Sequence, residues 1–316
     1  MLKTTENAKE TAAVVLPAVL CTLLWGSAFP CIKIGYLAFR VQGAFSQILF
    51  AGLRFALAGL LVLLFQLVRE KKLPVPPRQS CLSVFGLGLV MTTAQYLLFY
   101  LGLANTTGVR GSIIQGTGTF LTVILAHFFL RGEDRMTRRR ILGCLVGFVG
   151  VVLVNLDGAA GGFRLDGEGL LFLATAMFSV GSLLSKGITR TVDPFCATGW
   201  QLFLGGAVLV VIGLFGGGRL APTGAQSWGI FLYLAALSSI AFTIWTVLLQ
   251  KHPAGQVAVY NFLTPVFGVL LSALFLRESL SGWKTAAALV LVCAGIILVN
   301  RSAPAAEPQL PQRNHP

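Results

Sequence analysis

Charge is scarce in this sequence, and negative charge is the scarcest. Only 11% of the 316 residues are charged, and 11 are Asp or Glu against 24 that are Lys or Arg. Because a soluble domain carries about 25% charged residues, a deficit spread along the whole chain indicates a multi-pass membrane protein. The formal net charge of +13 does not point to a nucleic-acid partner, since the basic residues fall in short connectors between apolar runs.

Residues that bind metals or catalyse reactions are also few. The six cysteines stand singly inside apolar runs without a C-x-x-C pair, so neither a zinc site nor a disulfide framework is indicated. Only His127 of the three histidines lies clearly within an apolar run, and the acidic residues fall in tails, connectors or the ends of runs. An intramembrane enzyme needs acid, base or nucleophilic groups that converge. The sequence therefore favours a protein that is not an enzyme and that holds no metal and no cofactor.

Long apolar runs, in contrast, fill the chain. A bilayer span takes about 20 apolar residues. Ten segments fit this requirement, at residues 13–36, 45–68, 81–103, 109–130, 140–156, 168–189, 195–215, 227–250, 255–276 and 282–300. We therefore expect an all-α integral membrane protein with ten transmembrane helices. The first run is expected to stay as a helix, because Leu20 stands where a signal cleavage site needs a small residue.

The basic residues also predict the orientation of these helices. With a cytoplasmic N-terminus, 16 of the 24 Lys and Arg residues fall in the inner connectors and tails and 6 in the outer connectors. Cytoplasmic connectors of membrane proteins are enriched in Lys and Arg. The sequence thus predicts a protein of the cell membrane whose terminal tails, residues 1–12 and 301–316, both lie in the cytoplasm.

Two parts of the chain resemble each other. Residues 128–155 align with residues 274–300 after one deletion, so that both segments contain Phe-Leu-Arg from their second residue and end with Leu-Val-Asn. Further upstream, Gly52 aligns with Gly199 and Lys33 with Lys186. Apolar sequence aligns with itself easily, and chance similarity is the alternative explanation.

The repeat predicts two halves of opposite orientation. The first half covers residues 13–156 and the second residues 168–300, with an extracytoplasmic linker at 157–167. Each half would hold five spans, an odd number, so the second half would be inverted in the membrane. Many secondary transporters use inverted halves to build two access states around one site near the bilayer midplane.

Six motifs connect the chain to a known family. They are LWGSAFPCIK and LRFALAGLLVL in the first two runs, FLRGE and FLRES after the fourth and ninth, and LVGFVGVVLVN and LVCAGIILVN at the end of each half. With these motifs, residues 14–300 resemble the drug/metabolite transporter superfamily in its ten-helix EamA-like branch. The resemblance implies a carrier of a small metabolite without an ATPase domain, for which we expect export, and it does not identify the substrate.

Two prolines interrupt apolar runs. Pro30 and Pro265 each lack an N–H and displace the carbonyl four residues earlier, that of Gly26 or Asn261. Freed carbonyls at membrane depth must face protein or water, so each proline marks either a bend beside the substrate path or a packing kink. The family proline kept as Pro265 aligns with Thr119 in the first half, which leaves a symmetric role for it open.

Arg54 lies about nine residues into the second run, near the expected bilayer centre. A charge there costs at least ~2.5 kcal/mol unless it is paired or hydrated. One interpretation is a structural role, in which the guanidinium bonds freed carbonyls of neighbouring helices, and we favour it. The other is a ligand for a carboxylate or phosphate of the substrate.

Lys33 and Lys186 each lie near the C-terminal end of a run. A cation there suits the helix dipole and can extend to the headgroups, which is the favoured interpretation. In the inverted arrangement the two lysines would lie near opposite membrane faces, and the alternative is a pair of electrostatic gates at the two mouths of one path.

Polar and aromatic residues recur in the third, fourth, eighth and ninth runs and are candidates to line a substrate-binding cavity. Each is equally well explained by a hydrogen bond between helices. With one residue from each of the first two runs, the candidates are Trp25, Arg54, Gln95, Tyr96, Gln115, Trp245, Tyr260, Asn261 and Thr264. A G-x-x-x-G motif at Gly143 and Gly147 fits close helix packing, either internal or in a homodimer.

The missing acidic residues also bear on the substrate. The small multidrug resistance relatives carry a membrane-embedded glutamate for cations in their first helix, whereas residues 19–25 contain no acid here. A cation about 6 Å from Arg54 would be repelled by roughly 3 kcal/mol at an effective dielectric constant near 20. We therefore expect neutral, zwitterionic or anionic substrates, with amino-acid-like metabolites favoured. A passive facilitator or channel is the alternative to a carrier.

Overall fold

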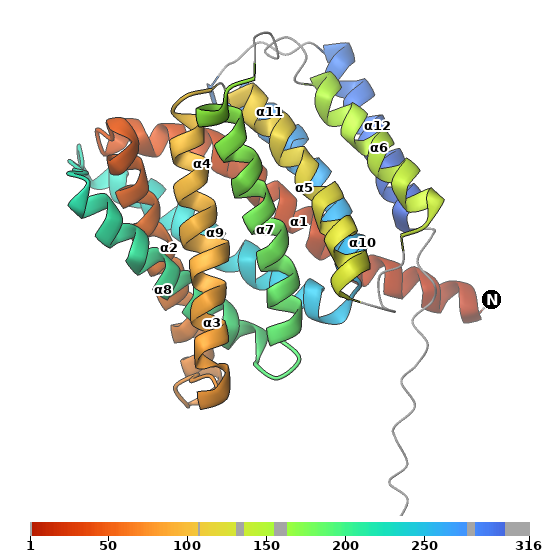
Figure 1. Ribbon diagram of the computed structural model, residues 1–316, viewed down its shortest axis with the longest axis horizontal. Helices are drawn as coiled ribbons and strands as arrows, with labels where there is room; N and C mark the ends of the chain where they lie inside the picture. Colours follow the sequence, from red (N-terminus) through yellow and green to blue (C-terminus); the bar gives the residue numbers. More distant parts are fainter. Residues whose placement is uncertain (1, 107, 131–135, 155–162, 277–281, 301–316) are drawn as a thin grey trace, which may run out of the picture.

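The computed structural model describes residues 2–106, 108–130, 136–154, 163–276 and 282–300, and the described residues are helical apart from short connections (Figure 1). The elements in chain order are α1 (Leu2–Ala38), α2 (Gly43–Glu70), η1 (Arg78–Ser80), α3 (Cys81–Gly88), η2 (Leu89–Ala94), α4 (Gln95–Leu103), α5 (Gly108–Phe129), α6 (Arg138–Val154), η4 (Leu165–Gly169), α7 (Leu170–Ile188), α8 (Pro194–Phe215), α9 (Ala225–Lys251), α10 (Ala254–Ala258), η5 (Val259–Phe262), α11 (Leu263–Leu276) and α12 (Gly282–Asn300). The expected all-α membrane architecture is confirmed at this level.

Eight stretches of helix in the described residues are long and apolar enough to cross a membrane. They are Ala13–Ala38, Gly43–Glu70, Arg78–Leu103, Leu165–Ile188, Pro194–Phe215, Ala225–Lys251, Ala254–Phe275 and Trp283–Asn300. The two other expected spans are helical but shorter, with the apolar stretch Ile113–Phe129 in α5 and the 17 residues of α6. The count of ten spans remains a prediction.

Three of the expected spans are not single α-helices. The third runs through α3, the π-helical segment η2 and α4, and the sixth begins in the π-helical segment η4 and continues as α7. The ninth runs through α10, the 3-10 segment η5 and α11. A π-helical turn inside a helix is uncommon and is frequent at functional sites. In the third span the π-helical segment directly precedes Gln95 and Tyr96, and it therefore affects the direction in which these two candidate side chains point from the helix.

The helices α2 and α8 pack against each other through glycines. A Cβ atom added to Gly52 would lie 2.9 Å from the carbonyl oxygen of Gly206, and one added to Gly59 would lie 2.5 Å from that of Gly199. These backbones touch because no side chain separates them, which is how small residues bring membrane helices together. Rising numbers in α2 meet falling numbers in α8, so the two helices are antiparallel.

A second glycine contact joins α6 to α12. A Cβ atom on Gly143 would lie 2.8 Å from the carbonyl oxygen of Gly295, and one on Gly150 would lie 2.9 Å from that of Ala288. This pair is also antiparallel, and Figure 1 shows it at one side of the molecule with the α2–α8 pair at the other. The G-x-x-x-G motif of Gly143 and Gly147 thus lies inside the fold, since both glycines approach the chain's own α12 or η5.

Local sequence explains how α8 begins. Asp193 is its N-cap, and its Oδ1 accepts hydrogen bonds from the backbone N–H groups of Phe195 at 2.9 Å and Cys196 at 3.1 Å. Pro194 occupies the first helical position, where a missing N–H costs nothing. The same carboxylate accepts a hydrogen bond of 3.0 Å from Nε2 of Gln66, which ties the start of α8 to the end of α2.

Candidate functional site

An aromatic cluster joins α1, α7 and α9. We use this name for Trp25 of α1, Phe178 of α7, and Phe242 and Trp245 of α9. The ring of Trp25 lies 5.1 Å from that of Trp245, 5.5 Å from Phe242 and 5.9 Å from Phe178. Two candidates from opposite halves of the sequence, Trp25 and Trp245, are therefore in direct contact.

The cluster continues through Phe55 to Arg54 and Tyr96. The ring of Phe55 lies 6.1 Å from Phe242 and 4.3 Å from Tyr96. The guanidinium carbon of Arg54 lies 4.3 Å from the centre of the Phe55 ring. A cation over an aromatic face is attracted by about 0.5–2 kcal/mol. The candidates Trp25, Arg54, Tyr96 and Trp245 are thus connected through one series of ring contacts.

The environment of Arg54 differs from the one favoured by the sequence. The side chain is 3% exposed, yet neither Nε nor Nη1 has a hydrogen-bond partner. No freed carbonyl among the described residues bonds these two nitrogens, and no described acidic side chain forms an ion pair with this residue. Arg54, which we expected to hydrogen-bond carbonyls of neighbouring helices, is a buried cation that packs on an aromatic ring.

Other buried polar atoms without a partner occur on the same helices. They are Nε1 of Trp25 and Oη of Tyr36 on α1, and Oε1 of Gln95 on α4. Buried polar groups are nearly always hydrogen-bonded, so each such exception calls for a physical explanation. Together with Arg54, these atoms give three helices, α1, α2 and α4, that direct unused hydrogen-bonding groups into the bundle.

The remaining candidates do not all join this cluster. Oη of Tyr260 accepts a hydrogen bond of 2.8 Å from Nδ2 of Asn300, so Tyr260 is directed toward α12. Oγ1 of Thr264 is buried without a partner. Asn261 and Gln115 are half-buried. A substrate-binding role for these four residues remains a prediction.

The two prolines have different local settings. Pro30 is buried within α1, which continues as one helix from Leu2 to Ala38. Pro265 lies in the first turn of α11, directly after the 3-10 segment η5, where a missing N–H is tolerated. Thr119, which aligns with Pro265, donates through Oγ1 to the carbonyl of Ala258 at 3.2 Å and so joins α5 to α10.

Lys186 does not extend to the headgroups. Its side chain is 6% exposed, and Nζ donates hydrogen bonds to the carbonyl oxygens of Leu249 at 3.0 Å and His252 at 2.8 Å. Its positive charge thus lies at the C-terminal end of α9, where the helix dipole favours a cation. Lys33, in contrast, has an exposed side chain. The two aligned lysines therefore occupy unlike environments, and a matched pair of gates stays a prediction.

One acidic side chain among those described is buried. Glu168 is 4% exposed, accepts hydrogen bonds from Oγ1 of Thr106 and from the backbone N–H of Arg164 at 2.8 Å, and lies in η4 at the start of the sixth expected span. No group of three or more His, Cys, Asp and Glu side chains suited to a metal ion is found in the part of the chain that the structure describes. The charge that approaches the aromatic cluster is therefore that of Arg54.

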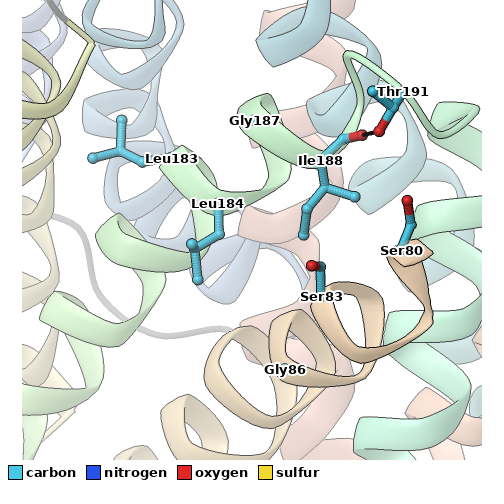
Figure 2. Close-up of a pocket in the computed structure, with 8 residues that line it drawn as sticks. All are labelled: Ser80, Ser83, Gly86, Leu183, Leu184, Gly187, Ile188 and Thr191. Atoms are coloured by element: carbon cyan, nitrogen blue, oxygen red, sulfur yellow. Dashed lines mark hydrogen bonds between the residues drawn. The ribbon is translucent and has the colours of Figure 1, made fainter.

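A surface groove lies apart from these residues. It has a volume of about 510 Å³ and lies between α3 and the C-terminal end of α7 (Figure 2). Its lining is mostly small or aliphatic, namely Ser80, Ser83, Gly86, Leu183, Leu184, Gly187, Ile188 and Thr191. None of the site residues predicted from the sequence lines this groove.

Sequence reasoning missed several members of the site. Phe55, Phe178 and Phe242 hold the cluster together, but a phenylalanine in an apolar run is indistinguishable by pattern from one that faces lipid. Tyr36 carries a signal that was available, since a hydroxyl near the end of a span needs a partner. Position 55 was also marked indirectly, because it directly follows the intramembrane arginine.

Comparison with known proteins places this geometry in a family. The model of the EamA-like transporter family matches residues 12–156 and 165–301. The uncharacterized transporter YyaM of Bacillus subtilis is 26% identical over 75% of this chain and 79% of its own length. A probable amino-acid metabolite efflux pump of Salmonella typhimurium is 26% identical over 89% of this chain and 92% of its own. A solved crystal structure matches the fold with a TM-score of 0.76 at 20% identity, covering 93% of this chain and 98% of that one. The chain is therefore a membrane protein that belongs to the EamA-like transporter family.

Proposed function

We propose that the protein is a secondary transporter that exports a small neutral, zwitterionic or anionic metabolite across the cell membrane by alternating access. Its ten spans form two inverted five-helix halves, with both termini in the cytoplasm. The observation that carries the proposal is the reciprocal contact between helices that are equivalent in the two halves. The supporting comparison is a similar protein named as a probable amino-acid metabolite efflux pump.

The α2–α8 contact has the form expected of a twofold axis. The sequence repeat equates Gly52 with Gly199 and Gly59 with Gly206. In the fold, Gly52 meets Gly206 and Gly59 meets Gly199. A twofold axis exchanges each residue with its equivalent in the other half. If Gly52 contacts Gly206, which is the equivalent of Gly59, then Gly59 must contact Gly199, which is the equivalent of Gly52. The antiparallel direction of the two helices supports an axis that lies in the membrane plane.

The α6–α12 contact repeats the pattern independently. The repeat equates Gly143 with Ala288 and Gly150 with Gly295. Gly143 meets Gly295, and Gly150 meets Ala288. Two separate helix pairs with reciprocal contacts support inverted halves more strongly than the sequence similarity alone. Such halves permit the bundle to open to either side of one central site, for which the aromatic cluster and Arg54 are the candidates.

The function is tested in cells and then in vesicles. Cells that overproduce the chain are expected to release an amino-acid-like metabolite faster than cells that lack it, as measured by metabolite profiles of the medium. The purified protein is then expected to move that metabolite into liposomes, and an imposed ion gradient is expected to change the final accumulation. A flux that only equalises concentrations under every gradient contradicts a coupled carrier and favours the passive facilitator.

A further inference from the structure

We propose that Arg54 binds a carboxylate of the transported molecule, with the face of Phe55 beneath the guanidinium. This inference rests on the proposed transport function and specifies its substrate class. It replaces the structural role that the sequence alone favours. Three observations carry it: the unused donors of Arg54, the aromatic surface next to the charge, and the lack of charge at the equivalent position in the second half.

The unused donors of Arg54 need an acceptor. The guanidinium is 97% removed from solvent contact in this structure, since the side chain is 3% exposed, and Nε and Nη1 have no partner. A buried guanidinium without hydrogen bonds is strongly disfavoured, and the attraction of the Phe55 ring offsets only part of that cost. A carboxylate is the ligand whose charge and planar geometry match a guanidinium best.

The surroundings of Arg54 suit a small carboxylate with an apolar body. Oη of Tyr36 is buried without a partner, so it is a further unused polar group on α1, the helix that carries Trp25. The series of rings from Phe55 through Phe242 to Trp25 then provides an apolar surface next to the charge. Nε1 of Trp25 is an unused donor at the far end of that series. A single charged group at one end of an aromatic surface fits an amino acid or a related carboxylate.

The second half of the chain offers no matching cation. Extending the alignment of Gly52 with Gly199 places Gln201 of α8 at the position of Arg54. Gln201 is 1% exposed and uncharged; its Oε1 accepts a hydrogen bond of 2.8 Å from Oγ1 of Thr92, and its Nε2 has no partner. One position of the pair is thus occupied by a neutral side chain and the other by a cation, and both retain unused donors. This asymmetry favours one anionic group per substrate molecule.

The test measures ligand protection and transport with matched probes. The probes are L-leucine, L-phenylalanine and L-threonine, each with its primary amide and its N-acetyl derivative. The amide removes the carboxylate and the N-acetyl derivative removes the ammonium group. We expect at least one of the free acids and its N-acetyl derivative to raise the melting temperature of the purified full chain and to compete for uptake into proteoliposomes. The corresponding amide should bind about 10- to 100-fold more weakly, which is the effect of losing hydrogen bonds to a charged group.

Variants assign the effect to Arg54. Arg54→Gln should weaken the acid about 10- to 100-fold. It should not weaken the amide, whose ammonium group Arg54 repels, so the preference for the acid disappears. The matched control is Arg140→Gln in α6, where an arginine that is 2% exposed lies outside the cluster and the acid preference should persist. If Arg54→Gln does not fold, Arg54→Lys and the ratio of acid to amide in the unmodified protein decide the question.

The outcomes separate this inference from the transport function. Equal binding of acid and amide, or an acid preference that survives in Arg54→Gln, overturns the carboxylate site and leaves transport intact. If the protein transports uncharged solutes but no carboxylate, the carboxylate site is likewise overturned and the transport function stands. A folded protein that moves neither class of solute contradicts the proposed function and the inference together.

Discussion

Replacing Gly59 by alanine should separate α2 from α8 and destabilise the protein. A Cβ atom at this position would lie 2.5 Å from the carbonyl oxygen of Gly199 and would also collide with the backbone nitrogen of Phe203. Both obstacles are backbone atoms of a helix, which cannot move aside as the end of a side chain can. The added methyl group must therefore push the two helices apart along their contact.

The magnitude follows from the distances. An ordinary contact between nonbonded carbon and oxygen atoms begins near 3.4 Å, so the backbones must separate by about 1 Å. Overpacking of this kind costs about 1–3 kcal/mol and occasionally more. The intrinsic helix propensity acts in the opposite direction, because alanine is favoured over glycine in a helix by about 0.8–1.0 kcal/mol. We expect a net loss of roughly 0–2 kcal/mol for Gly59→Ala, and a deficit of roughly 1–3 kcal/mol relative to an alanine substitution that gains the propensity without the collision.

The assay compares this variant with Gly229→Ala. Gly229 lies in α9, and a Cβ atom added there meets nothing within 4 Å. Thermal unfolding is monitored by heating each purified variant and measuring the remaining folded protein by size-exclusion chromatography. The midpoint temperature should be lower for Gly59→Ala and unchanged or higher for Gly229→Ala. Equal midpoints for the two variants would refute the close α2–α8 contact on which the reciprocal packing argument depends.

Three further predictions test other contacts and the topology. Lys186→Met should lower the free energy of unfolding by about 2–4 kcal/mol, because two carbonyls at the end of α9 lose a charged donor. The control Lys33→Met should change the unfolding midpoint little. Equal effects of the two substitutions would contradict the buried role of Lys186. Ser27→Ala and Tyr233→Phe should show a coupling of about 0.6–1.7 kcal/mol in a double-mutant cycle, because their hydroxyls lie 2.8 Å apart, and additive effects would mean that the hydrogen bond is not formed. A reporter fused to the C-terminus should be active only in its cytoplasmic form, and activity of an extracytoplasmic form would reverse the predicted orientation.

The apolar runs predicted most of the fold, because a membrane span has a simple requirement for length and composition. The details of the third and ninth spans were beyond that rule. The π-helical segment at Leu89–Ala94 and the 3-10 segment at Val259–Phe262 depend on how neighbouring helices satisfy the backbone, which composition does not record. Pro265 indicated an irregularity in the ninth span, but the 3-10 segment lies before the proline rather than at it.

The candidate site was predicted in part for a similar reason. Arg54, Trp25 and Trp245 are rare residue types in apolar runs, and they are the residues that the fold connects. The partners of Lys186 lie 63 and 66 positions away in the chain, so only the packing of α7 on α9 explains why this lysine is buried. A sequence pattern identifies an unusual charge, whereas its role depends on which atoms the fold brings near it.

Counterflow in proteoliposomes tests the central claim of alternating access most directly. Vesicles loaded with an excess of unlabelled metabolite are diluted into a trace of the same labelled metabolite, and the internal label is followed over time. A carrier that exposes one site to each side in turn predicts a transient accumulation of label above the external concentration, with an initial rate that saturates. Entry of label that only approaches the external concentration, with a rate proportional to concentration, would contradict alternating access and identify the protein as a passive channel.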